Sequence, residues 1–385
     1  LFRSLFFTQT ALMALHHGIM DHDNISSGLK NMRFEVTGAV YNAAMQRLKE
    51  GKEVIFTNVG NPHALGQNPI TFLRQVMALV TAPFLMDDPS IIAKFPQDAI
   101  ERAQKYLAMV KGGVGAYSDS RGNPGVIQEI CDFLERRDGF AGNPSNIFLT
   151  NGASEGVRNC LRALLTCNGG KRGVLTPIPQ YPLYTAAIAL YDGQACGYYL
   201  DEEQGWALSI PELERAHKEA TCRGVEVCAM VFISPGNPTG QLLSVDNLRE
   251  VIMFCMKHKL VLFSDEVYQE NVYIDQPFVS ARKVLHEMGE PYCSSLEMVN
   301  FHTASKGAWG ECGYRGGYFE LMNIDKQTNA EMYKLASVNL SPNVPGQIAM
   351  GIMVNPPAPG DESYPLFKQE KDARIASLAR RAQQI

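Results

Sequence analysis

Phe301-His-Thr-Ala-Ser-Lys306-Gly307 carries the strongest signal in this sequence. An apolar segment runs into small hydroxyl residues and a single lysine, an order expected where a buried strand ends in a functional loop. Arg315 follows nine residues after Lys306. A lysine that is desolvated or lies near another cation has a lowered pKa and can form an imine with an aldehyde cofactor. Taken alone, the stretch would more often be a surface lysine among serines, so its meaning depends on its surroundings.

Two upstream motifs also follow apolar segments directly. Phe263-Ser-Asp265-Glu-Val-Tyr268 places a carboxylate at a strand end, where a protonated pyridine nitrogen is a suitable partner, and its tyrosine can donate to a phenolic ring oxygen. Ser234-Pro-Gly-Asn237-Pro-Thr-Gly240 is a stiff turn that presents an amide to the same edge. Singly, Asp265 could instead cap the next helix and Asn237 could belong to an ordinary turn. The combination is specific, with 28 residues from the amide to the carboxylate and 41 more to the lysine.

Around these motifs, short β-branched segments alternate with longer helical patterns from about Val126 onward. This alternation predicts an α/β fold in which a parallel sheet is covered by helices on both faces. Each predicted strand ends where a polar or Gly/Pro motif begins, and ligands of open α/β sheets bind at the carboxyl ends of the strands. The predicted strands are Ile147–Thr150, Gly173–Thr176, Ala195–Tyr199, Ala229–Ile233, Leu260–Phe263 and Met298–His302.

The composition limits the classes of partner. The chain has 385 residues, with 35 basic and 40 acidic side chains and a net charge of -5. No basic stripe indicates nucleic acid or an anionic membrane, and no apolar run reaches the roughly 18–20 residues of a membrane span. Nine scattered cysteines without a CxxC pair predict a reduced intracellular protein, and no metal site is predicted. Small molecules are therefore the expected substrates.

The opening stretch 1–17 has one arginine and no acidic residue. It is typical of the tail of an organelle transit peptide, and an N-terminal extension before a start at Met20 explains it equally well. The compartment is therefore predicted to be cytoplasmic or mitochondrial, and the sequence does not choose between the two.

The three motifs together resemble the fold-type I aminotransferases, which depend on pyridoxal 5'-phosphate (PLP). The resemblance implies a large domain with a mixed, mostly parallel seven-stranded sheet between helices, and an incomplete small α/β domain. It also implies that Lys306 holds PLP as a Schiff base and moves protons as general base and acid. Asp265 would pair with the pyridine nitrogen, while Asn237 and Tyr268 would bind the ring oxygen. Tyr181 would stack on the ring, although by itself it could be a core aromatic; with Lys306 and Asp265 it completes the predicted catalytic set.

The phosphate of PLP is assigned to two groups of residues. One group follows a predicted strand and opens a helix, so its backbone amides and a serine hydroxyl can bind an anion at the helix N-terminus. The other group supplies hydroxyls and a guanidinium from the motif around the lysine. As a lone glycine-rich turn, the first group would mean little. The predicted phosphate contacts are Gly152, Ala153, Ser154, Thr303, Ser305 and Arg315.

A narrower resemblance to alanine aminotransferases rests on three stretches, Asn58–Gln67, Tyr117–Gly122 and Ser305–Gly317. It implies that Gly60 and Asn237 contact the substrate carboxylate. It also implies that Tyr117 reaches the phosphate of the neighbouring subunit in a homodimer. The reaction so implied moves an amino group between L-alanine and 2-oxoglutarate, giving pyruvate and L-glutamate.

The resemblance also divides the chain. Residues 1–95 are predicted to form an N-terminal arm and part of the small domain, 96–355 the large PLP-binding domain, and 356–385 the start of an interdomain helix. That helix pattern begins at Tyr364 and runs to the last residue, so the C-terminal part of the small domain is expected to be missing. The family's carboxylate-binding arginine would lie there, because Arg374, Arg380 and Arg381 precede its position.

Several other functions stay open at this point. A glutamate:glyoxylate aminotransferase would share the same cofactor residues, as would an aminocyclopropane-carboxylate-synthase-like lyase or a C–S lyase. A truncated PLP-binding chain with little turnover, or a catalytically silent protein of this fold, is a further alternative. An NAD-dependent dehydrogenase lacks support, since no predicted strand is followed by GxGxxG.

Overall fold

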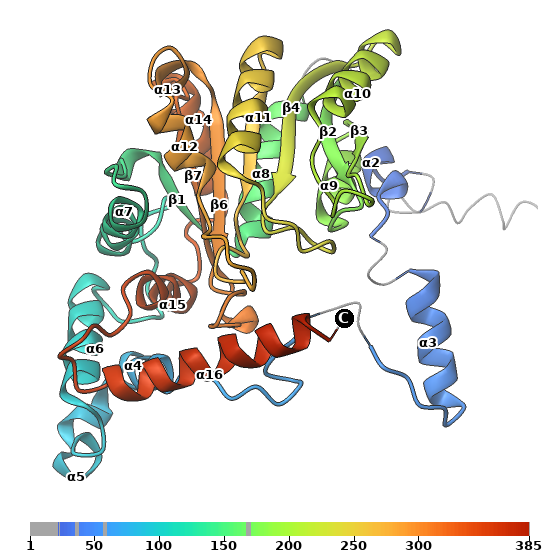
Figure 1. Cartoon of the computed structure of the whole chain (residues 1–385). Helices are drawn as coiled ribbons and strands as arrows, with labels where there is room; N and C mark the ends of the chain where they lie inside the picture. The colour runs from blue at the N-terminus through green and yellow to red at the C-terminus, as the bar shows by residue number, and fades with distance from the viewer. Residues whose placement is uncertain (1–21, 23, 35–37, 57–59, 167–170, 385) are drawn as a thin grey trace, which may run out of the picture.

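The computed structural model describes residues 22, 24–34, 38–56, 60–166 and 171–384, so the opening stretch 1–17 and the residues Asn58 and Val59 lie outside the described part. The centre of the fold is one seven-stranded sheet with the order β1-β7-β6-β5-β4-β2-β3 (Figure 1). Its strands are β1 (Ile147–Asn151), β2 (Arg172–Ile178), β3 (Gln194–Tyr199), β4 (Glu226–Ile233), β5 (Val261–Asp265), β6 (Met298–Thr303) and β7 (Gly316–Met322).

The sheet is mixed and mostly parallel, as the resemblance implied. β7 runs antiparallel to both of its neighbours, β1 and β6, and every pair from β6 to β3 is parallel. All six predicted strands are present, but β7 was not predicted. It begins with two glycines and contains Glu320, yet it is buried throughout. The buried Arg282 binds that carboxylate at 3.0 Å, a contact with no local sequence signal.

Alternation along the strands explains why helices cover both faces of the sheet. In β4, Ala229 and Val231 pack on one face, whereas Met230 and Phe232 pack on the other. The first face is covered by α8 (Ala153–Leu165), α9 (Leu183–Leu190) and α14 (Lys326–Ser337). The second face is covered by α7 (Pro124–Asp138), α10 (Ile210–Cys222), α11 (Val245–His258), α12 (Ala281–Glu287), α13 (Tyr292–Ser295) and α15 (Val344–Val354).

A further core lies beside β1 and β7, where α7 and α15 pack with α4 (Thr71–Thr81) and α6 (Gln97–Met109). Because α4 shares this core with later helices, packing crosses the predicted boundary at residue 95, and the domain division stays a prediction. The predicted C-terminal helix is confirmed as α16 (Tyr364–Ala382). The remaining helices are α2 (Ser27–Asn31), α3 (Ala39–Lys49), α5 (Pro89–Ile92) and the short 3-10 helices η2 (Pro83–Asp87), η3 (Pro144–Asn146) and η5 (Cys312–Tyr314).

Figure 1 shows α16 crossing below the sheet, on the side toward which β4 points. The carboxyl ends of the parallel strands, and the loops that follow them, therefore lie toward the space between the sheet and α16. This is the edge at which open α/β sheets bind ligands. Among the described residues, no helix is long and apolar enough to cross a lipid bilayer.

Candidate active site

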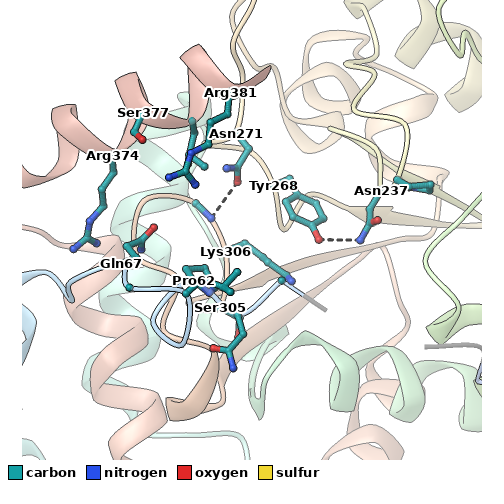
Figure 2. Close-up of a pocket in the computed structure, with 18 of the residues that line it drawn as sticks. Pro62, Gln67, Asn237, Tyr268, Asn271, Ser305, Lys306, Arg374, Ser377 and Arg381 are labelled. Carbon is teal, nitrogen blue, oxygen red and sulfur yellow. Dashed lines mark hydrogen bonds between the residues drawn. The ribbon is translucent and has the colours of Figure 1, made fainter. Parts of the chain in front are cut away.

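A pocket of about 990 Å³ lies between the strand ends and α16. Such a volume suits a small-molecule site. The pocket is lined by loops that follow β2, β4, β5 and β6, by the segment 60–68, and by one side of α16 (Figure 2). The predicted site residues that line it are Gly60, Tyr181, Asn237, Tyr268, Ser305 and Lys306.

Lys306 lies in the loop after β6, with its Nζ 5.3 Å from the centre of the Tyr268 ring. Tyr268 follows β5, and its hydroxyl accepts a hydrogen bond of 2.9 Å from the Asn237 amide, which follows β4 (Figure 2). Because β4, β5 and β6 are neighbours in the sheet, three motifs that are distant in sequence meet at one edge. Tyr181 belongs to the same group, because the charge of Lys306 is near enough to act on its hydroxyl. Burial raises the pKa of Tyr181, and the charge of Lys306 opposes that rise.

Asp265 is the last residue of β5 and is only 6% exposed. The fully buried Tyr184 hydroxyl donates a hydrogen bond of 2.7 Å to its Oδ2, and the Val267 amide donates to Oδ1 at 3.3 Å. Burial raises the pKa of the Asp265 carboxyl, while those hydrogen bonds and the charge of Lys306 act in the opposite direction. Asp265 is therefore a buried carboxylate behind the pocket, and its pKa responds to nearby positive charge.

The N-terminus of α8 forms the predicted anion site. Gly152 is its N-cap residue, with φ +82°, and no side chain caps the helix there. A Cβ atom at Gly152 would lie 2.3 Å from Arg315 Nη2, so glycine is required for the guanidinium to reach the helix end. Ala153 and Ser154 form the first turn, where backbone N–H groups lack helical partners and favour an anion.

Arg315 connects this helix end to the loop of Lys306. Its guanidinium donates to the Ser305 hydroxyl at 3.4 Å and to the Asn151 carbonyl at 3.3 Å. Thr303 is buried behind them: its hydroxyl donates to the Gly316 carbonyl at 2.7 Å and accepts from the Ser305 amide at 3.2 Å. The structure thus brings Ser305 and Arg315 together, whereas Thr303 holds the loop and does not line the pocket.

Two predicted residues lie at the margins. Gly60 lines the pocket, and an added Cβ atom there would meet nothing within 4 Å. Tyr117 lies outside the pocket, in the loop between α6 and α7, and is 77% exposed. Its predicted partner is in another subunit, so its role stays a prediction.

The sequence pattern of aminotransferase classes I and II matches residues 88–383. The chain belongs to this family. It is 53% identical over 364 residues to "Glutamate--glyoxylate aminotransferase 1" of Arabidopsis thaliana, covering 94% of this chain and 75% of that protein. It is 45% identical over 374 residues to "Alanine aminotransferase 1, mitochondrial" of the same plant, covering 94% of this chain and 68% of that protein. An alanine aminotransferase structure from Pyrococcus furiosus shares the fold, with a TM-score of 0.69, 20% identity and coverage of 90% and 75%.

This aminotransferase is a PLP-dependent transaminase, as its family is, and the residues present fit that cofactor. A dianionic phosphate suits the bare N-terminus of α8 with Arg315 beside it. A protonated ring nitrogen suits the buried Asp265 carboxylate, whose charge is supported by Tyr184, the Val267 amide and the nearby Lys306. Together these groups match the two charged ends of one molecule.

The prediction from sequence missed residues that the fold brings to this aminotransferase site. Tyr184 lies three residues after Tyr181, in the first turn of α9, but nothing in the motif indicates that its hydroxyl reaches Asp265. Arg374 and Arg381 are seven residues apart on α16, a spacing that places them on one side of a helix, and both line the pocket (Figure 2). The seven-residue spacing was the available signal, and it gained meaning only once α16 was placed against the strand ends.

Proposed function

We propose that the chain transfers the amino group of L-alanine to 2-oxoglutarate, giving pyruvate and L-glutamate. The observation that carries the proposal is that Lys306 lines the pocket, that its charge acts on the buried Asp265 carboxyl, and that Arg315 links its loop to the N-terminus of α8. The choice of substrates is supported by 45% identity to a protein named as an alanine aminotransferase.

The cofactor supplies an aldehyde that links covalently to amines and a cationic ring that withdraws electrons from the substrate's α-carbon. In our proposal the Lys306 amine is the point of attachment and, once released, moves the α-proton as base and then as acid. Its position beside Tyr268, 5.3 Å from the ring centre, keeps the amine inside the pocket. A single amine can serve both steps, because the proton that it takes from the substrate's α-carbon as base is the one that it then donates to a neighbouring atom as acid.

The other residues act by binding and orientation. Asp265 keeps a proton on the ring nitrogen, because a buried carboxylate favours a cation as its partner. The Asn237 amide and the Tyr268 hydroxyl, already joined at 2.9 Å, present donors to the ring oxygen. Tyr181 supplies a face for stacking, while Ser305, Arg315 and the first turn of α8 hold the phosphate. Gly60 contributes a backbone contact to the substrate carboxylate.

Transfer between glutamate and glyoxylate is a second candidate reaction. It is favoured by 53% identity to a protein named for that reaction, against 45% to the alanine aminotransferase. The cofactor residues are the same for both reactions, so the difference lies on the substrate side of the pocket.

The discriminating experiment measures initial rates with the PLP-loaded chain and three substrate pairs: alanine with 2-oxoglutarate, alanine with glyoxylate, and glutamate with glyoxylate. We expect pyruvate formation from alanine and 2-oxoglutarate to have the highest kcat/KM. A higher value for glutamate with glyoxylate would replace the first proposal by the second. A lack of any oxo-acid product would contradict both.

Assembly and compartment are part of the same proposal. The exposed Tyr117 is suited to contact a second copy, and family membership supports a homodimer. Light scattering of the purified chain tests this, since a monomer would leave Tyr117 without its proposed role. The compartment is proposed to be the cytosol or the mitochondrion, and a relative named as mitochondrial supports the latter.

A further inference from the structure

Glu311 lies five residues after Lys306 and is only 1% exposed. Its backbone is fixed in the loop, because its amide donates to the Ala304 carbonyl at 2.9 Å and its carbonyl accepts from the Tyr314 amide at 3.2 Å. The Glu311 side chain is therefore anchored to the loop that carries Lys306. The reaction proposed above gives this buried carboxylate no chemical role.

The cations around Glu311 come from a different part of the chain. Arg74, on α4, donates from Nη2 to Oε2 at 3.0 Å, and its guanidinium also lies over the Tyr314 ring, 5.1 Å from the centre. His63 Nδ1 lies 3.9 Å from the same oxygen. Burial raises the pKa of the Glu311 carboxyl, and the charges of Arg74, His63 and Arg374 oppose that rise. The carboxylate therefore depends on nearby positive charge, that of Arg74 first, to stay ionised.

His63 belongs to the substrate-side segment, which we define as residues 60–68. This segment is a closed turn in its own right: the Leu65 amide donates to the Asn61 carbonyl at 3.1 Å, and the Gln67 amide donates to the Pro62 carbonyl at 3.0 Å. Such a turn moves as a unit. Holding it at His63 therefore also sets the position of Gly60, at its pocket end.

The substrate-side segment and the loop of Lys306 are in close contact. A Cβ atom at Gly310, where φ is +62°, would lie 3.1 Å from Gln67 Nε2 and 3.3 Å from Pro62 Cγ, so the glycine allows the two to pack. Arg374, on α16, donates to the Ala308 carbonyl at 2.6 Å and to the Asn68 carbonyl, and so bridges both parts. The contacts join two of the stretches that carry the resemblance to alanine aminotransferases.

We propose that Glu311 is a positioning residue: held between Arg74 and His63, its carboxylate fixes the substrate-side segment against the loop that carries Lys306. The inference rests on the proposed function, in which Gly60 contacts the substrate carboxylate. Every amino-acid and oxo-acid substrate carries that carboxylate. Loosening the segment therefore raises KM for all substrates by a similar factor, and kcat changes less.

The test compares Glu311→Gln with the unaltered, PLP-loaded chain. We expect KM for alanine and for 2-oxoglutarate to rise about tenfold, kcat to fall by less than about threefold, and the cofactor absorbance to be unchanged. Hydrogen exchange of the amides in residues 61–68 should become several-fold faster, while exchange in the sheet stays the same. Arg74→Gln should act in the same direction, and Arg74→Lys, which keeps the charge, should recover part of the loss.

Glu129→Gln is the matched control, because Glu129 is also a buried carboxylate, 4% exposed and paired with Lys105 at 2.6 Å, but lies away from the pocket. It should leave KM and the exchange of residues 61–68 unchanged. The proposal is overturned if Glu311→Gln and Arg74→Gln leave both readouts within twofold, if Glu129→Gln changes both readouts as much as they do, or if exchange becomes faster throughout the sheet as well as in residues 61–68. Absent turnover in the unaltered chain would overturn the proposed function alone, and the exchange data would still decide the role of Glu311.

Discussion

In our proposal the cofactor side of the pocket is built from residues at strand ends, whereas the substrate side is built from the segment 60–68 and α16, with support from Arg74 on α4. These substrate-side parts lie outside the sheet. On the cofactor side, Asp265 is 6% exposed and is bound by the fully buried Tyr184. On the substrate side, Gly60 and Arg381 are exposed, and a few ionic contacts around Glu311 hold the segment in place. The first side is preorganised by the sheet, while the second depends on contacts between distant parts of the chain.

From this comparison we expect changes on the cofactor side to lower kcat more, and changes on the substrate side to raise mainly KM.

Replacing Lys306 should have the largest effect of all. Lys306→Ala removes the amine that attaches the cofactor and moves the proton, and kcat should fall about 10⁴-fold or more. Lys306→Arg keeps a positive charge but not the reactive amine, so it should be equally inactive. Steady-state rates with alanine and 2-oxoglutarate check this, and near-normal turnover by either variant would remove Lys306 from the mechanism.

Removing the charge of Asp265 is expected to have the next largest effect. Asp265→Asn keeps the shape of the side chain but not its negative charge at the ring nitrogen, so kcat should fall on the order of 10²–10³-fold. The cofactor should still bind, because the phosphate contacts near Arg315 are unchanged. Asp98→Asn is the control, since Asp98 bonds Ser363 away from the pocket. If kcat of Asp265→Asn stayed within threefold of that of the unaltered chain, the negative charge at the ring nitrogen would not contribute to catalysis as proposed.

Tyr184→Phe tests the support behind Asp265. The hydrogen bond from Tyr184 lowers the pKa of a carboxyl that burial raises, so its loss should raise that pKa further. The acid limb of the kcat/KM profile should then move to higher pH, and kcat/KM should fall about ten- to a hundredfold. Tyr198→Phe is a matched control: Tyr198 is equally buried, but its hydroxyl donates to the Val231 carbonyl. Identical pH profiles for the two variants would show that Tyr184 acts only in packing.

The smallest predicted effect concerns stability in acid. Burial lowers the pKa of His302, in β6, from 6.5 to about 3. Folding therefore keeps the imidazole neutral, and its contribution to stability is complete above pH 6.5 and is lost as the pH falls toward 3. Within that window, each fall of one pH unit should raise the unfolding equilibrium constant about tenfold through this group. The buried Glu266 and Glu320, with raised pKa values, act in the opposite direction.

Urea unfolding of His302→Phe and of the unaltered chain at several pH values isolates this contribution, because the carboxylates are common to both. The variant should lose less stability on acidification. Parallel curves for the two proteins would show that His302 does not titrate between the folded and unfolded states as proposed.

Sequence patterns were sufficient to predict that the three motifs of Asn237, Asp265 and Lys306 meet at one edge of the sheet, because each follows a strand; their roles stay predictions. Each predicted strand is a short apolar run, and Asn237, Asp265 and Lys306 come directly or shortly after such a run. Neighbouring strands then bring them together without further information. β7 was missed because its buried Glu320 contradicts the pattern, and the ion pair with the distant Arg282 that supports this burial has no local signal.

The substrate side could not be predicted in the same way. His63, Arg74 and Arg374 meet the loop of Lys306 through tertiary contacts, and their sequence separations carry no periodic signal. The motif around Gly60 was recognised, but the reason for its other residues emerged only when the turn was seen to pack against Gly310. Contacts of this kind depend on how α4 and α16 are placed, which no local pattern specifies.

The most direct test of the central claim is the absorption spectrum of the purified chain with PLP, before and after addition of alanine. The account predicts a visible band from cofactor bound at Lys306, and its loss when alanine takes up the first half of the reaction. The same experiment with Lys306→Ala should show neither the lysine-bound band nor the same conversion. A band that alanine leaves unchanged, or a spectrum of Lys306→Ala identical to that of the unaltered chain, would contradict the account.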